Sequence, residues 1–102
     1  MLNKLFIYGT LMNPEIQQEI FGREIVGIRD VLKGYKKSTI VIDGEIYPLA
    51  VLDANGSIDG LIIELSDEEL EKADGYESDA YNRIQVTLDS GLSTWVYTEV
   101  IM

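Results

Sequence analysis

The sequence predicts an α+β fold: a small, mixed, mostly antiparallel β-barrel with two or more short helices. Three observations support this prediction. Runs of strand-forming residues recur along the chain, hairpin turn signals join several of them, and only two segments carry helix-capping signals. The length of 102 residues suits a single domain over residues 1–102.

The first two predicted elements are a buried strand, Lys4–Tyr8, and a short helix. The strand is a run of mostly apolar and aromatic residues. Asn13 can cap the helix, Pro14 suits its first position because no N–H is needed there, and Gly22 can end it. The chain therefore leaves a strand through Gly9-Thr10 and begins a helix almost at once.

The next part of the chain is predicted to be extended, with strands over 31–35 ("VLKGY") and 38–42 ("STIVI"). Gly34 is expected to mark a bulge or a close backbone approach. Asp43-Gly44, directly after these strands, is a hairpin turn signal.

Two more strands are predicted over 46–52 and 58–65. Pro48 in the first implies an edge strand or a bulge, because proline cannot donate to a neighbouring strand. Asn55-Gly56 between the two strands is interpreted as a turn.

The best-specified helix is predicted over 66–76. Ser66 and Glu69 match a capping box, and Leu65 and Leu70 can form a hydrophobic staple. Two alternating runs close the chain, over 81–88 and 93–100, with a hairpin at 89–91. The total is six or seven strands, paired mainly in antiparallel fashion.

Charge and composition argue against several function classes. The net charge of −10 argues against nucleic acid and anionic membranes as partners, because both are bound by clustered basic residues. Only Lys33, Lys36 and Lys37 lie close together in the sequence, and they could either steer an anionic substrate or solvate a strand. Neither a signal peptide nor a run of about 18 apolar residues is visible, so the cytoplasm is the expected compartment.

The chain contains no cysteine and no histidine. Disulfides, thiolate ligands, cysteine nucleophiles and Ser-His-Asp triads are therefore excluded. If the chain is an enzyme, its base is expected to be a carboxylate with a raised pKa, or a lysine or tyrosine with a lowered pKa.

The first candidate site is "YGTLM", directly after the first strand. A strand that ends in glycine before a helix can point several backbone N–H groups at one spot, which suits a carboxylate or a phosphate. A tight strand-to-helix connection without any ligand explains the same residues. The motif alone leaves both interpretations open.

The second candidate is "DGYESDAYNR", between the second helix and the strand that follows it. Tyr81 and Arg83 are expected on the same face of that strand. Glu77, at the mouth of a barrel, would be partly desolvated, and its pKa would rise. Arg83 could instead support the structure by pairing with Asp74 or Asp79, and a solvated loop is the simplest alternative.

A third pattern, over 53–64, spaces oxygen-bearing side chains like a calcium loop. Ile58 stands where that loop requires glycine, and the flanks are strand-like. An ordinary Asn-Gly turn is the better explanation, so no metal site is predicted.

Five short motifs follow one another along almost the whole chain: "YGTL" (8–11), "LKGY" (32–35), "YPLAV" (47–51), "DGLIIEL" (59–65) and "DGYESDAYNR" (74–83). In this order they resemble the γ-glutamylcyclotransferase-like family, including its γ-glutamylamine cyclotransferase branch. The last motif contains the family's Asp-x-x-Glu followed by Tyr-x-Arg. Ala73 stands where the family often has leucine, and the chain is short.

The resemblance implies a small mixed barrel with flanking helices, and it implies that Glu77 is the catalytic acid/base. It implies that the loop after the first strand holds the γ-glutamyl group of a small-molecule substrate, largely through backbone N–H groups. No metal or cofactor is called for. The residues that it places in the substrate site are Tyr8, Gly9, Thr10, Leu11 and Tyr81.

The implied reaction is intramolecular: the α-amine of the substrate attacks its own γ-carbonyl, and 5-oxoproline and a free amine are the products. Glu77 would take a proton from the α-ammonium and deliver one to the leaving nitrogen. The main alternative is a module that binds a small carboxylate or a γ-glutamyl end without turnover, and a third possibility is a protein-interaction domain on the same scaffold. The identity of the leaving amine and the oligomeric state stay open.

Overall fold

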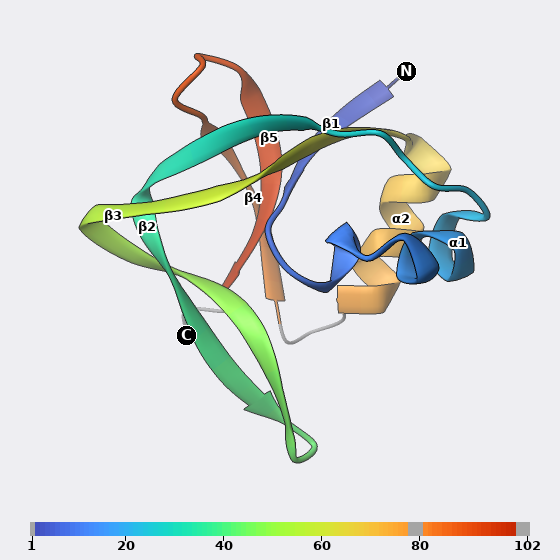
Figure 1. Ribbon diagram of the computed structural model, residues 1–102, viewed down its shortest axis with the longest axis horizontal. Helices are drawn as coiled ribbons and strands as arrows, with labels where there is room; N and C mark the ends of the chain where they lie inside the picture. Colours follow the sequence, from blue (N-terminus) through green and yellow to red (C-terminus); the bar gives the residue numbers. More distant parts are fainter. Residues whose placement is uncertain (1, 78–80, 100–102) are drawn as a thin grey trace.

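The computed structural model describes residues 2–77 and 81–99, which contain five strands, two α-helices and one short 3-10 helix (Figure 1). No helix in these two ranges is long and apolar enough to span a bilayer. In chain order the elements are β1 (Leu2–Ile7), η1 (Thr10–Met12), α1 (Pro14–Phe21), β2 (Ile28–Ile42), β3 (Glu45–Ser66), α2 (Asp67–Glu77), β4 (Tyr81–Thr87) and β5 (Ser93–Glu99).

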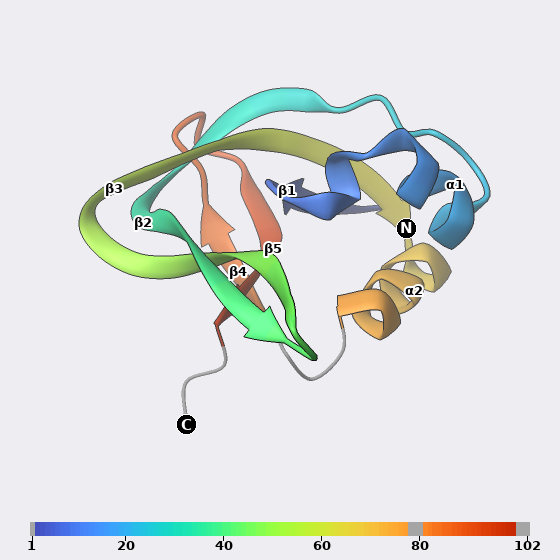
Figure 2. The same cartoon turned by 60° about the horizontal axis from the view of Figure 1, so that its bottom comes forward.

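The five strands form one curled sheet in the order β2-β3-β1-β5-β4, and the two helices pack together beside it (Figures 1 and 2). β1 is antiparallel to β3 and parallel to β5, whereas the β2–β3 and β4–β5 pairs are antiparallel hairpins. The α+β class and the mixed, mostly antiparallel pairing are confirmed. The sheet curls into a half-closed barrel, in which the turn that follows β4 meets β2 at the other edge. There the N–H of Asp89 donates to the carbonyl oxygen of Val31 (2.9 Å).

The structure has fewer strands than the sequence predicted, because two pairs of predicted strands are each one long strand. β2 contains both 31–35 and 38–42, and β3 contains both 46–52 and 58–65. The predicted turn at Asn55-Gly56 is therefore wrong, since the chain stays extended there and only bends.

The bend coincides with a bulge in the β2–β3 ribbon. The register of the pairing shifts between Lys33 and Tyr35, and Gly34 between them has a φ of +87°, so the expected bulge is confirmed. A Cβ on Gly56 would lie 2.4 Å from the carbonyl oxygen of Tyr35. Glycine at this position permits the two backbones to approach each other. In the sequence alone, an Asn-Gly pair that serves such an approach looks the same as one that reverses the chain.

Both helices begin as the sequence predicted. The Asn13 side chain accepts a hydrogen bond from the N–H of Glu15 (2.9 Å), and Gly22 ends α1 in the left-handed conformation. At the start of α2, the Ser66 hydroxyl accepts from the N–H of Glu69 (3.1 Å), and the Glu69 carboxylate accepts from the N–H of Ser66 (3.0 Å). This reciprocal pair is the predicted capping box.

β1 separates the two halves of the hydrophobic core. Leu5 and Ile7 pack with side chains of both helices, whereas Phe6 and Tyr8 pack against the inner face of the curled sheet. The alternation follows from the strand period of two residues. Each of these side chains is almost fully buried, and burial of one such side chain contributes about 1.5–3 kcal/mol to stability. The loop that follows β1 is therefore held by both halves of the core.

Candidate active site

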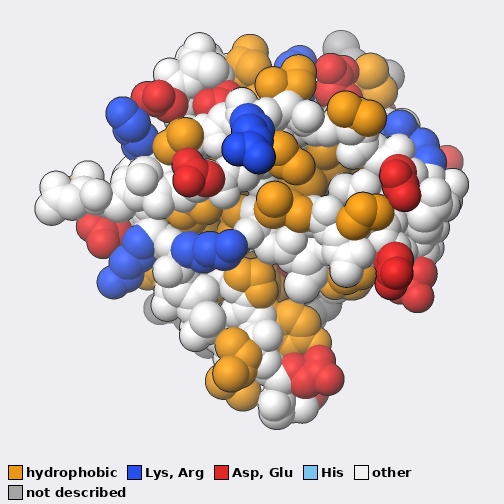
Figure 3. All heavy atoms as spheres, viewed as in Figure 1, with side chains coloured by type: hydrophobic (Ala, Val, Ile, Leu, Met, Phe, Trp, Pro, Cys, Tyr) orange, Lys and Arg blue, Asp and Glu red, His pale blue; other side chains and the backbone are white. Residues whose placement is uncertain are grey.

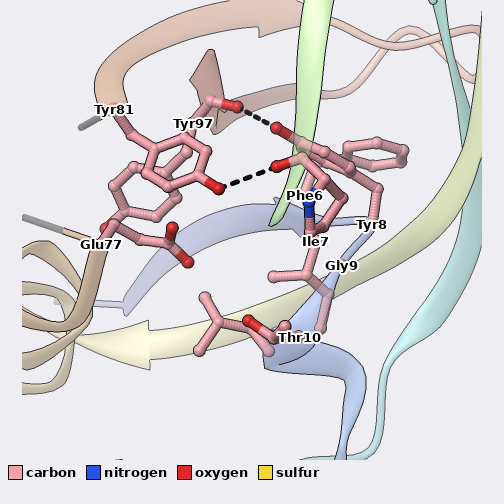
Figure 4. Close-up of a pocket in the computed structure, with 10 residues that line it drawn as sticks. Phe6, Ile7, Tyr8, Gly9, Thr10, Glu77, Tyr81 and Tyr97 are labelled. Carbon is pink, nitrogen blue, oxygen red and sulfur yellow. Dashed lines mark hydrogen bonds between the residues drawn. The ribbon is translucent and has the colours of Figure 1, made fainter. Parts of the chain in front are cut away.

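A pocket lies where β1 ends and meets the C-terminal end of α2 (Figure 4). It brings together all six residues of the site that the resemblance implied, from three separate segments of the chain. The free volume is about 20 Å³, which is room for about one water molecule. The lining residues are Phe6, Ile7, Tyr8, Gly9, Thr10, Leu11, Pro48, Glu77, Tyr81 and Tyr97.

The loop Gly9-Thr10 presents backbone donors beside this pocket. The carbonyl oxygens of Gly9 and Thr10 accept from the N–H groups of Met12 and Asn13, each at 3.0 Å. No loop or turn backbone hydrogen bond of the described residues engages the N–H of Gly9 or of Thr10. Two donors are therefore available to an anion, as expected at the start of a helical turn.

Packing explains why position 9 is a glycine. A Cβ on Gly9 would lie 2.5 Å from the Cγ of Pro48, closer than real Cβ atoms come to a neighbour. Gly9 thus lets the loop lie against β3.

Gln17 of α1 holds this loop through its side chain, and no motif in the sequence pointed to it. Its side chain is 3% exposed; the amide nitrogen donates to the carbonyl oxygen of Leu11 (2.8 Å), and the amide oxygen accepts from the N–H of Ile25 (2.9 Å). The available signal was its place on α1 four residues before Phe21, where an apolar side chain would be expected.

Glu77 is the last residue of α2, and its carboxyl reaches into the pocket toward the Gly9-Thr10 loop (Figure 4). Burial raises the pKa of this carboxyl from 4.5 to about 7. Within the described ranges, neither a cation nor a hydrogen-bond donor contacts it. Near neutral pH the group is thus divided between its acid and base forms, which suits proton transfer in both directions.

The two predicted tyrosines use their hydroxyl groups to tie strands together around the pocket. The Tyr8 hydroxyl donates to the carbonyl oxygen of Tyr97 (2.5 Å) and accepts from the N–H of Ala50 (3.0 Å). The Tyr81 hydroxyl donates to the carbonyl oxygen of Pro48 (2.8 Å; Figure 4). Burial raises the pKa of both phenols, to about 12 for Tyr81, so neither is a base near neutral pH.

Arg83 supports the end of α2 from outside the pocket. Its guanidinium binds both carboxylate oxygens of Asp74, at 2.8 and 3.0 Å, and lies 4.3 Å from the ring centroid of Trp95. The Tyr97 hydroxyl donates to the same carboxylate (2.7 Å). Of the two predicted partners of Arg83, Asp74 is therefore confirmed; the other, Asp79, lies outside the described residues.

Tyr76 is a further residue at the rim, for which the sequence suggested no role. Its partly exposed hydroxyl donates to the side-chain oxygen of Thr10 (2.9 Å). This bond joins the last turn of α2 to η1, the two elements that carry Glu77 and the loop donors. Its position on the surface makes it easier to open than the buried tyrosine contacts.

Comparison with known proteins decides the family. The family model described as gamma-glutamyl cyclotransferase, AIG2-like, matches residues 5–99, which include every residue of the pocket. The chain belongs to this family. AIG2-like protein C of Arabidopsis thaliana is 30% identical over 80 residues, covering 78% of this chain and 45% of that protein. The chain thus spans about half the length of the curated relatives that it matches.

Solved structures also match this chain, and they show the same fold. A solution structure of an Arabidopsis thaliana protein superposes with a TM-score of 0.83 at 27% identity, covering 98% of this chain and 63% of that one. A structure named gamma-glutamyl cyclotransferase gives a TM-score of 0.83 at 12% identity, covering 98% and 68%. At that identity the second likeness shows the fold alone. The resemblance and the fold predicted from the sequence are both confirmed.

Proposed function

We propose that this chain cyclises a γ-glutamyl amide or related γ-glutamyl conjugate, producing 5-oxoproline and a free amine. The proposal rests mainly on one observation. The carboxyl of Glu77, which has no partner among residues 2–77 and 81–99, shares a pocket with the loop whose N–H donors, at Gly9 and Thr10, are not engaged by these residues either. The donors suit the anionic end of a glutamyl group, and the carboxyl suits proton transfer. Membership of the gamma-glutamyl cyclotransferase, AIG2-like, family supports the same reaction.

The proposed reaction exchanges one C–N bond for another within the substrate. The α-nitrogen attacks the γ-carbonyl carbon, a five-membered ring closes, and the bond from that carbon to the leaving nitrogen breaks. The α-nitrogen loses two protons as the ammonium becomes the ring N–H, and the leaving nitrogen gains two protons and departs as an ammonium ion. Glu77 takes each proton from the first nitrogen and gives it to the second, so the enzyme ends in the protonation state in which it began. A pKa of about 7 permits both steps near neutral pH.

The contribution of the loop is to position the substrate. Ring closure requires the glutamyl chain to fold back on itself, and donors on the α-carboxylate can hold one end while the γ-carbonyl faces Glu77. The pocket has room for about one water molecule, so binding requires its rim to move outward. The hydrogen bond between Tyr76 and Thr10 is exposed at this rim, so it opens more easily than the buried hydrogen bonds of Tyr8.

The alternative is a module that binds a small carboxylate or a γ-glutamyl end without chemistry. The loop donors alone would serve such a module. A buried carboxyl beside an anion site weakens binding whenever it is ionised, so Glu77 favours the enzyme. A protein-interaction domain would bind neither ligand.

The test is a product analysis with a panel of γ-glutamyl amines and γ-glutamyl peptides. The proposal predicts 5-oxoproline and free amine in equal amounts, and no glutamate, measured by mass spectrometry. Glutamate in place of 5-oxoproline would show hydrolysis by water. Measurable binding without product for every compound would support the binding module instead.

A further inference from the structure

Gln17 is an unexpected residue on the buried face of a helix. Among residues 2–77 and 81–99, the buried polar side chains are those of Gln17, Thr94 and Thr98, and Gln17 carries the only amide among them. Burial of an amide costs free energy unless its donor and its acceptor are both bonded, and an apolar side chain would fill the same space without that cost. The hydrogen bonds of Gln17 therefore need an explanation beyond packing.

The amide nitrogen of Gln17 determines how one peptide group of the loop after β1 is oriented. It donates to the carbonyl oxygen of Leu11 (2.8 Å). The same peptide group contains the N–H of Met12, which donates to the carbonyl oxygen of Gly9 (3.0 Å). A peptide group is planar and trans, so its C=O and its N–H point in opposite directions, and a bond at one end fixes the direction of the other. The peptide group between Leu11 and Met12 is thus held at both ends.

The next peptide group carries one of the donors beside the pocket. The Gly9 carbonyl that accepts from Met12 belongs to the same peptide group as the N–H of Thr10, so this N–H points away from Met12. At the other end, the N–H of Ile25 donates to the amide oxygen of Gln17 (2.9 Å). Three hydrogen bonds thus join four amide groups head to tail, from Ile25 to Thr10. Hydrogen bonds in such a hydrogen-bond chain polarise one another, and the aligned dipoles leave a partial positive charge at the Thr10 N–H.

The surroundings of the loop otherwise disfavour an anion. Among the described residues that line the pocket, none is a lysine or an arginine. α1, which follows the loop, carries Glu15 and Glu19 and no basic residue. Figure 3 shows several acidic side chains over the side of the molecule that carries the two helices. A carboxylate at this loop depends on backbone donors, so a stronger Thr10 N–H matters more here than in a site with a cation.

We propose that Gln17 is a positioning residue of the substrate site: through the hydrogen-bond chain it fixes and strengthens the Thr10 N–H as a donor to the carboxylate of the γ-glutamyl group. The inference rests on the proposed function and adds a residue to the part of the site that binds substrate. Gln17 does not line the pocket, so its effect on the substrate passes through the peptide groups of the loop. Glu77 lies on α2, outside the hydrogen-bond chain, so substrate binding and proton transfer depend on separate parts of the structure.

The experiment replaces Gln17 by methionine, which has a similar length but no amide. We expect Gln17→Met to raise both KM and the Kd from NMR titrations for γ-glutamyl-ethylamide by about ten-fold, because a hydrogen bond to a charged group is weakened. kcat and its dependence on pH should stay at the parental values. A purely structural role would instead lower the folded fraction of the protein, and with it kcat, at unchanged KM. Gln18→Met, at the exposed next position of α1, is the matched control and should leave KM and Kd unchanged.

A second measurement uses the parent protein and decides the inference even where Gln17→Met does not fold. A carboxylate bound at the Thr10 N–H should polarise the whole hydrogen-bond chain. At saturation with γ-glutamyl-ethylamide, the NMR resonance of the amide proton that Gln17 donates to Leu11 should therefore move downfield, whereas the side-chain amide of Gln18 should not move. A Gln17 resonance that stays in place on binding would contradict the inference.

The inference and the proposed reaction fail in different ways. If γ-glutamyl-ethylamide binds but yields no 5-oxoproline, the proposed reaction is wrong for this compound, and the effect of Gln17→Met on Kd still decides the role of Gln17. If the compound is turned over and Gln17→Met keeps the parental KM and Kd, Gln17 only stabilises the fold, and the proposed reaction stands. Absence of binding at millimolar concentration would count against both.

Discussion

Gly9 and Pro48 are in contact at the wall between the loop after β1 and the strand β3: a Cβ on Gly9 would lie 2.5 Å from the Cγ of Pro48. The carbonyl oxygen of the same proline accepts the hydrogen bond from Tyr81, at 2.8 Å. The loop after β1, the strand β3 and the start of β4 therefore meet at Pro48. The distances between these three segments set the width of the candidate active site.

Replacing Gly9 by alanine forces this wall apart. We expect Gly9→Ala to lower the free energy of unfolding by about 1–3 kcal/mol, as overpacking does elsewhere, and to raise KM. Urea unfolding and steady-state kinetics measure both effects. Gly75→Ala is the control, because a Cβ there meets no atom within 4 Å and alanine favours a helix by up to about 1 kcal/mol. Equal stability of the two variants would show that the contact with Pro48 is unimportant.

The Arg83–Asp74 pair is predicted to stabilise the end of α2. Arg83→Gln removes a two-point hydrogen bond and the stacking on Trp95, so we expect a loss of about 1–2 kcal/mol in urea unfolding. Lys33→Gln breaks a more exposed ion pair, with Asp89, and is expected to cost under about 0.5 kcal/mol. A loss for Arg83→Gln as small as that for Lys33→Gln would contradict the supporting role.

Burial of Glu77 is predicted to make stability depend on pH in a definite direction. The pKa is about 7 in the folded chain against an ordinary 4.5, so the folded state holds this proton more tightly than the unfolded state. The contribution of the protonated group is complete below pH 4.5 and is lost as the pH rises through 7. The stability of Glu77→Gln relative to the parent should therefore increase between pH 4 and pH 8 in matched urea titrations. A difference in the free energy of unfolding that does not change with pH would show that the Glu77 carboxyl is exposed to water.

The rate is predicted to follow the same group. Because the base form of Glu77 begins the reaction, kcat/KM should rise with pH and level off above an apparent pKa near 7. An NMR titration of the labelled Glu77 carboxyl in the free protein should give the same value. Agreement between the kinetic pKa and the NMR pKa would show that Glu77 controls the rate. A Glu77 carboxyl that titrates near its ordinary pKa of 4.5 would show that another group controls it.

Much of the fold could be predicted from local patterns, because caps and turns depend on neighbouring residues. The capping box of Ser66 and Glu69 and the bulge at Gly34 are examples. The number of strands could not be predicted in the same way. Gly56 serves a close approach of two backbones within one strand, and the sequence near it matches a true turn equally well.

The candidate site was predicted less from local patterns than from the order of several motifs. Gly9 and Glu77 are far apart in the sequence. Before the fold was known, only the family resemblance indicated that they belong to one site. Tyr76 could not be predicted, because it acts through one long-range hydrogen bond that leaves no periodic signal. Gln17 left only one signal, a polar residue at an apolar position of α1, and that position does not indicate its two hydrogen bonds. The parallel pairing of β1 with β5 could not be predicted either, because it joins two strands that are far apart in the sequence.

The central claim is that Glu77 transfers protons in a cyclisation. Its most direct test is the initial rate of 5-oxoproline formation from a γ-glutamyl conjugate that the parent protein turns over, measured for the parent and for Glu77→Gln at pH 7.5. Glutamine keeps the size of the side chain but cannot accept the proton, so we expect the rate to fall by a factor of about 100 or more, while NMR titration shows that the substrate still binds. A Glu77→Gln protein that forms 5-oxoproline at the parental rate would contradict the claim.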